Sequence, residues 1–131
     1  MEIHHIGYLV RNLEESARQF EILGWRQASE RVHDERRRVQ ICFLKNNDTL
    51  IELVQPDKDC EIIGTALKRL RNTPYHICYE CRDLDDSAAR LGEQGYHVID
   101  TPSPAPAIEG KRVVFLYGSD VGLIELVEEK G

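Results

Sequence analysis

No apolar run in this 131-residue sequence is long enough to cross a membrane as a helix, and the N-terminus "MEIHHIGYLV" enters a strand-like pattern at once. We therefore expect neither a membrane span nor a signal peptide. Basic residues are also in deficit, because 17 Lys and Arg stand against 23 Asp and Glu, which gives a formal net charge of −6. Without a basic field, nucleic acid is not an expected partner.

A disulfide framework is missing too. Two of the four cysteines, Cys78 and Cys81, form a CxxC, but they lie in the strand-like run "YHICYEC". A spacing of three places them on opposite faces of a strand, so they are expected neither to pair nor to chelate one ion together. Buried, reduced thiols are typical of cytoplasmic proteins, and the cytoplasm is the expected location.

The sequence does contain an internal repeat. Its composition, 41% hydrophobic and 31% charged, is typical of one soluble domain over residues 1–131. Within it, "LIELV" occurs at 50–54 and again at 123–127. Residues 5–25 also match 76–96 without a gap, with 8 of 21 positions identical, and "ICFL" and "VVFL" form a third matched pair. Matches in the same order indicate a duplicated module. The predicted parts are module 1 (1–56), a linker (57–73) and module 2 (74–131).

Each module is predicted to run strand, helix, strand, strand, strand, which is an α+β pattern. Asn12 and Asp83 are the expected helix N-caps and Gly24 and Gly95 the expected helix ends, because apolar residues recur at helical spacing between them. The later strands are expected at 25–32, 38–45 and 48–54 in module 1, and at 96–100, 111–117 and 121–127 in module 2. A short helix is expected at 61–70, and "TPSPAPAIEG" (101–110) is expected to be a loop.

Each module also supplies one histidine at the start of its first strand and one glutamate in its last strand. These are His5 with Glu52, and His76 with Glu125. Taken singly, such a histidine is more often structural, and such a glutamate can face solvent. Recurrence at matching places in both modules favours one shared site for a divalent metal ion, for which Zn, Ni, Co, Fe and Mn suit the donors. A buried charge needs such a partner.

The remaining histidines are interpreted as structural or surface residues. His4 is expected to point away from His5 on its strand, and His33 and His97 have no counterpart in the other module. Cys78 and Glu80 share the face of His76 and are expected near the site.

The paired modules and the His…Glu…His…Glu set resemble the vicinal oxygen chelate superfamily over nearly the whole chain. The resemblance implies two βαβββ modules forming a U-shaped, eight-stranded mixed sheet around a metal, with the four residues above on the ligand positions. The motifs "HIGYLVRNLEES", "IELVQP", "YHICYECRDLDD" and "GLIELVE", together with the linker, are most similar to the methylmalonyl-CoA epimerase branch. Glyoxalase I typically carries arginine and asparagine where this sequence has Leu9 and Pro56, which argues against glutathione.

The sequence also departs from the epimerase pattern. Gln40 stands near the place of a second catalytic glutamate, and Tyr117–Gly118 replaces a common His-Pro pair. Gln40 cannot act as a base, and it is predicted to contact substrate together with Cys78 and Tyr117. Both departures bear on methylmalonyl-CoA as the substrate, and they leave the four predicted metal ligands in place.

The resemblance implies a metal-dependent isomerase or epimerase, in which Glu125 and Glu52 are the catalytic bases. A glyoxalase I-like lyase or thiol-transfer resistance enzyme is the first alternative. A non-catalytic drug-binding resistance protein is the second, although members of that class usually lack the metal quartet. The expected substrate is a small acyl thioester or oxo or hydroxy acid. The expected assembly is a homodimer.

Overall fold

The computed structural model describes residues 1–60 and 72–129, so the helix predicted at 61–70 lies outside the described residues. The chain divides into two compact units. The N-terminal unit consists of Ile6–Tyr75, and the C-terminal unit consists of Met1–His5 with His76–Gly131. The first strand of the sequence therefore contributes residues to both units. Among the described residues, no helix is long and apolar enough to span a membrane.

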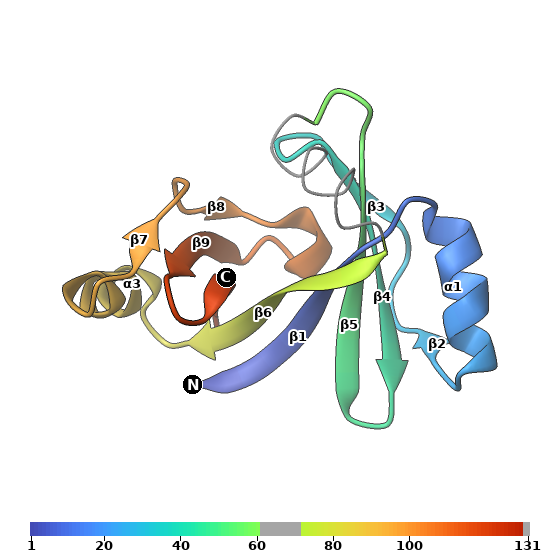
Figure 1. The fold of residues 1–131 in the computed structure, drawn as a ribbon, viewed down its shortest axis with the longest axis horizontal. Helices are drawn as coiled ribbons and strands as arrows, with labels where there is room; N and C mark the ends of the chain where they lie inside the picture. The colour runs from blue at the N-terminus through green and yellow to red at the C-terminus, as the bar shows by residue number, and fades with distance from the viewer. Residues whose placement is uncertain (61–71, 130–131) are drawn as a thin grey trace. The chain divides into compact units, whose positions relative to one another are not determined.

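The N-terminal unit places one helix against an antiparallel set of strands. Its last long strand, β5, pairs antiparallel with β4 and parallel with β1, and the two short strands β2 and β3 both pair with β4. Figure 1 shows α1 running alongside β2 and β4. The elements are β1 (Glu2–Leu9), α1 (Leu13–Ile22), β2 (Arg26–Gln27), β3 (Val32–Asp34), β4 (Val39–Asn46) and β5 (Thr49–Pro56).

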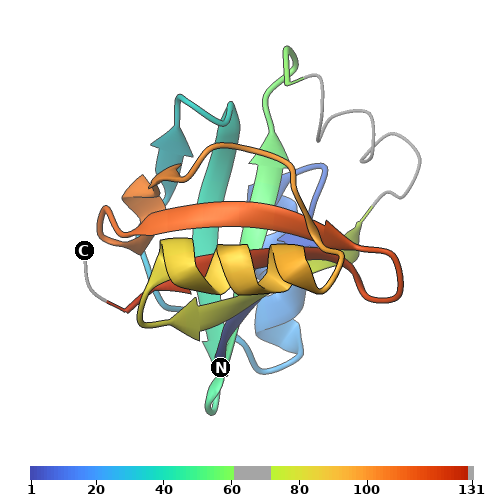
Figure 2. The same ribbon diagram turned by 90° about the vertical axis from the view of Figure 1, so that its left-hand side faces the viewer.

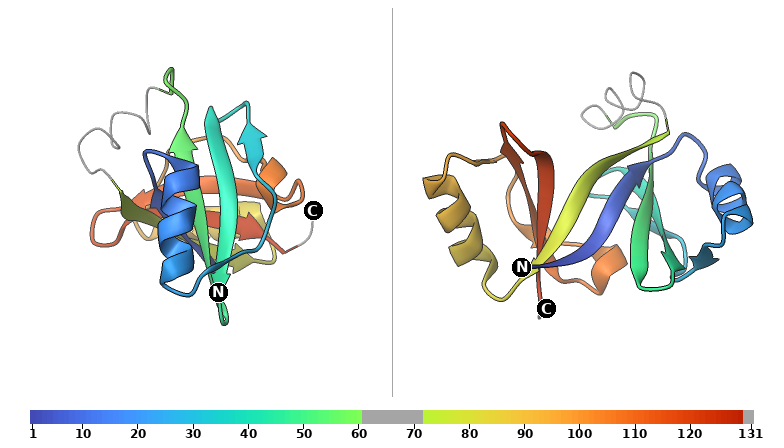
Figure 3. Two further views of the ribbon diagram at one scale, coloured as in Figure 1. Left: turned by 90° about the vertical axis from the view of Figure 1, so that its right-hand side faces the viewer. Right: turned by 60° about the horizontal axis from the view of Figure 1, so that its bottom comes forward.

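The C-terminal unit repeats this arrangement. Its last strand, β10, pairs antiparallel with β9 and parallel with β6, while β7 and β8 pair with β9. Figure 2 shows α3 lying across β9 and β10, and the right panel of Figure 3 shows the start of β1 beside β6. The elements are β6 (Thr73–Cys81), α3 (Leu84–Glu93), β7 (His97–Val98), β8 (Ser103–Pro104), the 3₁₀ helix η1 (Pro106–Ile108), β9 (Arg112–Gly118) and β10 (Gly122–Glu128).

Each helix begins where the sequence predicts. The side chain of Asn12 accepts a hydrogen bond from the Glu15 N–H, and that of Asp83 accepts one from the Asp86 N–H. Such caps satisfy backbone donors that the first helical turn leaves without a partner. After each helix the chain reverses through a glycine with positive φ, +103° at Gly24 and +97° at Gly95, a conformation that strains any residue with a Cβ.

The same positions of the repeat build a core under each helix. In the N-terminal unit the buried set is Val10, Leu13, Cys42, Leu44, Ile51 and Leu53. In the C-terminal unit it is Cys81, Leu84, Val114, Leu116, Ile124 and Leu126. Both "LIELV" segments therefore give their isoleucine and second leucine to the helix-covered face. Strand alternation must turn the intervening glutamate to the opposite face.

The α+β class and the mixed pairing are confirmed, and the described residues contain ten strands instead of the expected eight. The strand predicted at 25–32 is split into β2 and β3, because the Ser29 hydroxyl takes the Phe43 N–H that a strand carbonyl would otherwise accept. The matching strand in the second module is cut short in the same way, with the Asp100 carboxylate accepting from the Phe115 N–H. The tenth strand, β8, lies with η1 in the stretch predicted to be a loop.

Candidate metal centre

Both glutamates of the repeated pentapeptide are buried on the strand face that is turned away from the helices. Glu52 in β5 keeps 5% of its surface exposed and Glu125 in β10 keeps 4%. In each case the neighbouring strand places a phenylalanine directly opposite in register, Phe43 for Glu52 and Phe115 for Glu125. A carboxylate with so little access to water needs compensating partners.

In the C-terminal unit the partners of Glu125 are two buried imidazoles. His5 comes from the start of β1 and His76 from β6, with 1% and 4% exposure. Oε1 of Glu125 lies 3.1 Å from Nε2 of His76 and 3.2 Å from Nε2 of His5. The two Nε2 atoms are themselves 3.2 Å apart. Three potential ligand atoms therefore form a nearly equilateral triangle inside the protein.

The size of this triangle fits a divalent cation. With metal–ligand bonds of about 2.1 Å, neighbouring donors stand about 3.0 Å apart in an octahedral site and about 3.4 Å apart in a tetrahedral one. The observed separations of 3.1–3.2 Å fall between these two values. Imidazole and carboxylate together suit Zn, Ni, Co, Fe or Mn. Both the spacing and the chemistry of the donors therefore suit a divalent metal ion.

The electrostatics of the cluster keep Glu125 charged. Burial raises the pKa of this carboxyl, but hydrogen bonds from His5 and His76 and the positive charge of those rings outweigh it, and the pKa lies well below its ordinary value. Glu125 is therefore ionised at neutral pH. The ionised carboxylate is the form that can coordinate a cation.

Glu52 belongs to the N-terminal unit and occupies the equivalent place there. It lies in register with Gly7 of β1 and Phe43 of β4, at the centre of its own "LIELV" segment. Gly7 presents no side chain of its own beside Glu52.

Aromatic residues beside the glutamates are site residues that the sequence analysis missed. The ring of Phe115 meets the His76 ring edge to face, with centroids 5.1 Å apart and planes at 87°. Such a contact holds the imidazole plane and gives it an apolar neighbour. The signal was present in the matched "ICFL" and "VVFL" segments, which supply Phe43 and Phe115 at equivalent positions.

The three predicted substrate contacts stay predictions, and the structure shows on which strand face each residue lies. Cys78 is fully buried and lies in register with Glu125, on the same face as His76. Tyr117 shares the strand face of Phe115 and is 46% exposed, so a ligand can reach it. Gln40 lies on the same face of β4 as Cys42 by strand alternation, opposite to the face of Phe43 and Glu52.

The expectation for His4 was wrong. Its Nδ1 lies 2.8 Å from Nδ1 of His5, although the two are consecutive strand residues. Alternation fixes the direction of the Cα–Cβ bonds, and rotation about the side-chain bonds can still bring the two rings together. His33 pairs with Asp57 at 2.7 Å near the surface, and His97 is exposed, as expected for both.

Known proteins resemble this chain over nearly its whole length. Residues 4–115 match the Glyoxalase/Bleomycin resistance protein/Dioxygenase superfamily. The mitochondrial methylmalonyl-CoA epimerase of Dictyostelium discoideum is 30% identical over 131 residues, covering 98% of this chain and 78% of that protein. The ethylmalonyl-CoA/methylmalonyl-CoA epimerase of Cereibacter sphaeroides is 29% identical over 127 residues, covering 95% of each chain.

The fold is shared with solved structures as well. A variant of the Streptomyces coelicolor methylmalonyl-CoA epimerase, in complex with 2-nitronate-propionyl-CoA, superposes with a TM-score of 0.86 at 24% identity. That alignment covers 100% of this chain and 99% of the other.

Proposed function

The chain belongs to the glyoxalase/bleomycin resistance/dioxygenase superfamily and to its methylmalonyl-CoA epimerase family, and from this premise we propose that it is a metal-dependent epimerase acting on the α-carbon of methylmalonyl-CoA or a closely related acyl-CoA. The observation that carries the proposal is the buried triangle of His5, His76 and Glu125. The relatives supply the substrate class, since they are named for methylmalonyl-CoA and ethylmalonyl-CoA.

We assign His5, His76, Glu125 and Glu52 as the metal ligands. The first three are already at ligand spacing. Glu52 is included because it matches Glu125 in segment, burial and aromatic neighbour. Two neutral imidazoles and two carboxylates balance the charge of a divalent ion, which allows it to be held away from water. Zn, Ni, Co, Fe and Mn all suit this donor set.

Epimerisation requires that one face of the α-carbon lose a proton and the other face receive one. We assign these two transfers to the two buried carboxylates, Glu125 and Glu52. The ion would supply polarisation of the thioester carbonyl and stabilisation of the enolate oxygen. Glu125 is a weak base because its pKa is lowered, so it can accept the proton only from an α-carbon made acidic in this way.

The surroundings of the carboxylates suit this chemistry. Phe115 opposite Glu125 and Phe43 opposite Glu52 limit the access of water, which strengthens electrostatic interactions inside the site. Exclusion of water also protects an enolate from protonation by solvent. Tyr117, exposed on the face of Phe115, is the residue we expect to contact the substrate first.

Deuterium exchange at the α-carbon tests the proposal. Protein loaded with Co²⁺ is incubated in D₂O with methylmalonyl-CoA, ethylmalonyl-CoA, or the hemithioacetal of methylglyoxal and glutathione, and label is followed by mass spectrometry. We expect exchange with one or both acyl-CoA thioesters, and loss of exchange after chelation. Because acid–base groups typically contribute about 10²–10⁴-fold, Glu125→Gln should slow exchange by at least about 100-fold.

Glu129→Gln is the matched control, because Glu129 is an exposed carboxylate just beyond β10, and it should exchange like the wild type. Conversion of the hemithioacetal without deuterium exchange into either thioester would contradict the epimerase proposal and favour the glyoxalase-type lyase. Drug binding by a protein that takes up no metal would favour the sequestration alternative. A homodimer stays a prediction from the resemblance, which sedimentation equilibrium can test.

A further inference from the structure

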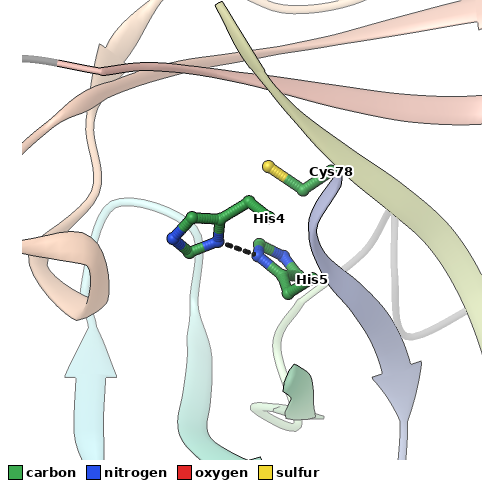
Figure 4. A group of neighbouring side chains, drawn as sticks. All are labelled: His4, His5 and Cys78. Atoms are coloured by element: carbon green, nitrogen blue, oxygen red, sulfur yellow. Dashed lines mark hydrogen bonds between the residues drawn. The ribbon is translucent and has the colours of Figure 1, made fainter. Parts of the chain in front are cut away.

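The buried histidine His5 contacts a second histidine on the side opposite to Glu125. Its Nδ1 lies 2.8 Å from Nδ1 of His4, and the two rings meet edge to face with centroids 5.0 Å apart. Figure 4 shows this contact, with the side chain of Cys78 beside the two rings. Potential ligand atoms of all three residues lie within 4.8 Å of one another. The group is therefore either a second metal site or a hydrogen-bonded support for His5.

The distance between the two Nδ1 atoms decides between these readings. Two nitrogens bound to one divalent ion at about 2.1 Å stand about 3.0 Å apart in an octahedral site and about 3.4 Å apart in a tetrahedral one. The observed 2.8 Å is shorter than both, and it is the length of a hydrogen bond in which one ring donates a proton and the other accepts it. By contrast, the 3.2 Å between Nε2 of His5 and Nε2 of His76 is close to the spacing of metal ligands.

We propose that His4 is a positioning residue that holds His5 in the tautomer able to bind a metal. The inference rests on the metal centre proposed above. A neutral imidazole that presents the lone pair of Nε2 to a cation carries its proton on Nδ1. In this structure Nδ1 of His4 lies at hydrogen-bond distance from Nδ1 of His5, where it can accept that proton. The contact therefore fixes both the tautomer and the ring orientation of His5, as outer partners of metal-bound histidines do elsewhere.

The position of His4 in the strand explains why it can do this. As the residue before His5, it is held by the same strand backbone, so the pair does not depend on a separate loop. His4 is half-buried whereas His5 is 1% exposed, so the support connects the buried ring to the more accessible one.

Three variants of the full chain separate this role from simple packing. His4→Phe keeps a flat ring and removes both nitrogens, while His4→Asn places an acceptor oxygen near the position of Nδ1. His97→Phe is the control, because His97 is an exposed histidine in β7. Titration calorimetry with Zn²⁺ and Co²⁺ should show about 10–100-fold weaker binding for His4→Phe, the range typical of lost outer-shell partners. His4→Asn should recover most of the affinity, and His97→Phe should match the wild type.

Nitrogen NMR of the Zn²⁺-loaded proteins adds a readout that packing alone would not change. In the wild type and in His4→Asn, we expect His5 to bind through Nε2 with its proton on Nδ1, and in His4→Phe that signature should be lost or divided between tautomers. Binding by His4→Phe within about twofold of the wild type would overturn the inference, as would failure of His4→Asn to recover affinity. A second equivalent of Zn²⁺ that disappears in Cys78→Ser would show that the group is a metal site instead. A wild-type protein that binds no metal would overturn this inference together with the proposed function.

Discussion

Replacement of Glu125 by glutamine is the most informative single perturbation, because it removes the negative charge of the buried cluster while keeping the shape of the side chain. A hydrogen bond to a charged group contributes about 1.5–3 kcal/mol and a neutral one about 0.5–1.5 kcal/mol. Weakening the bonds from both His5 and His76 therefore costs about 2–3 kcal/mol. Burial of the carboxylate opposes its ionisation, so the neutral amide recovers part of this cost. We therefore expect the free energy of unfolding of the metal-free variant to be about 1–2 kcal/mol lower than that of the wild type.

Metal binding should make the difference larger. For the wild type, a free metal concentration of 100 times Kd adds about 2.7 kcal/mol to the free energy of unfolding. If loss of the carboxylate weakens binding about 100-fold, the same concentration adds only about 0.4 kcal/mol to the variant. For a chain of this length, 1 kcal/mol corresponds to about 3–5 °C in Tm. The metal-induced rise in Tm should therefore be about 8–13 °C for the wild type and about 1–2 °C for Glu125→Gln.

Calorimetric scans of both proteins, in chelator and in excess Co²⁺, measure all four values. Circular dichroism at 25 °C first establishes that both are folded. An equal rise in Tm with Co²⁺ for the variant and the wild type would refute this role of Glu125, because the cation would then be bound without it.

Three other perturbations test separate parts of the account. Leu53 and Leu126 occupy equivalent, fully buried positions of the repeat. Replacement of either by alanine should lower the free energy of unfolding, measured in urea, by about 2–5 kcal/mol. A change near zero for either would contradict its place in the core. Asn12→Ala should lower stability by about 1 kcal/mol through the lost cap, whereas an unchanged urea midpoint would show that the cap contributes nothing. Burial is the largest influence on the thiols of Cys42 and Cys81 and raises the pKa of each above 9.0, so a thiol reagent at pH 8 should modify half-buried Cys60 first. The raised pKa values of Cys42 and Cys81 stabilise the folded state only while their thiols stay protonated. This stabilisation is complete below about pH 8.5 and is lost as the pH rises through the pKa values of the folded state. Faster labelling of Cys42 or Cys81 than of Cys60 would contradict the predicted order of modification.

The fold was predictable largely because local signals and the internal repeat agreed. Asn12 and Asp83 cap the helices as expected, and alternation within "LIELV" placed Glu52 and Glu125 on the face away from the helices. The epimerase resemblance is confirmed by the relatives that match nearly the whole chain. The helix caps and the strand faces follow from local residue types and backbone periodicity, which can be read from the sequence.

The errors arose where the structure depends on the conformation of a side chain or on its contact with a neighbouring strand. Ser29 and Asp100 end two predicted strands early by accepting a backbone N–H from a neighbouring strand, and nothing near them in the sequence indicates that partner. The strand face of Gln40 also follows from the β4–β5 register and not from its family position. The contact of His4 with His5 depends on side-chain rotation, which alternation along a strand does not specify.

Anomalous scattering from crystals grown with Co²⁺ or Zn²⁺ tests the metal centre most directly. We predict a single strong peak for each chain, about 2.0–2.2 Å from Nε2 of His5, Nε2 of His76 and Oε1 of Glu125, with Glu52 completing the protein ligands. A peak between His4 and Cys78, or no peak near His76 and Glu125, would contradict the account.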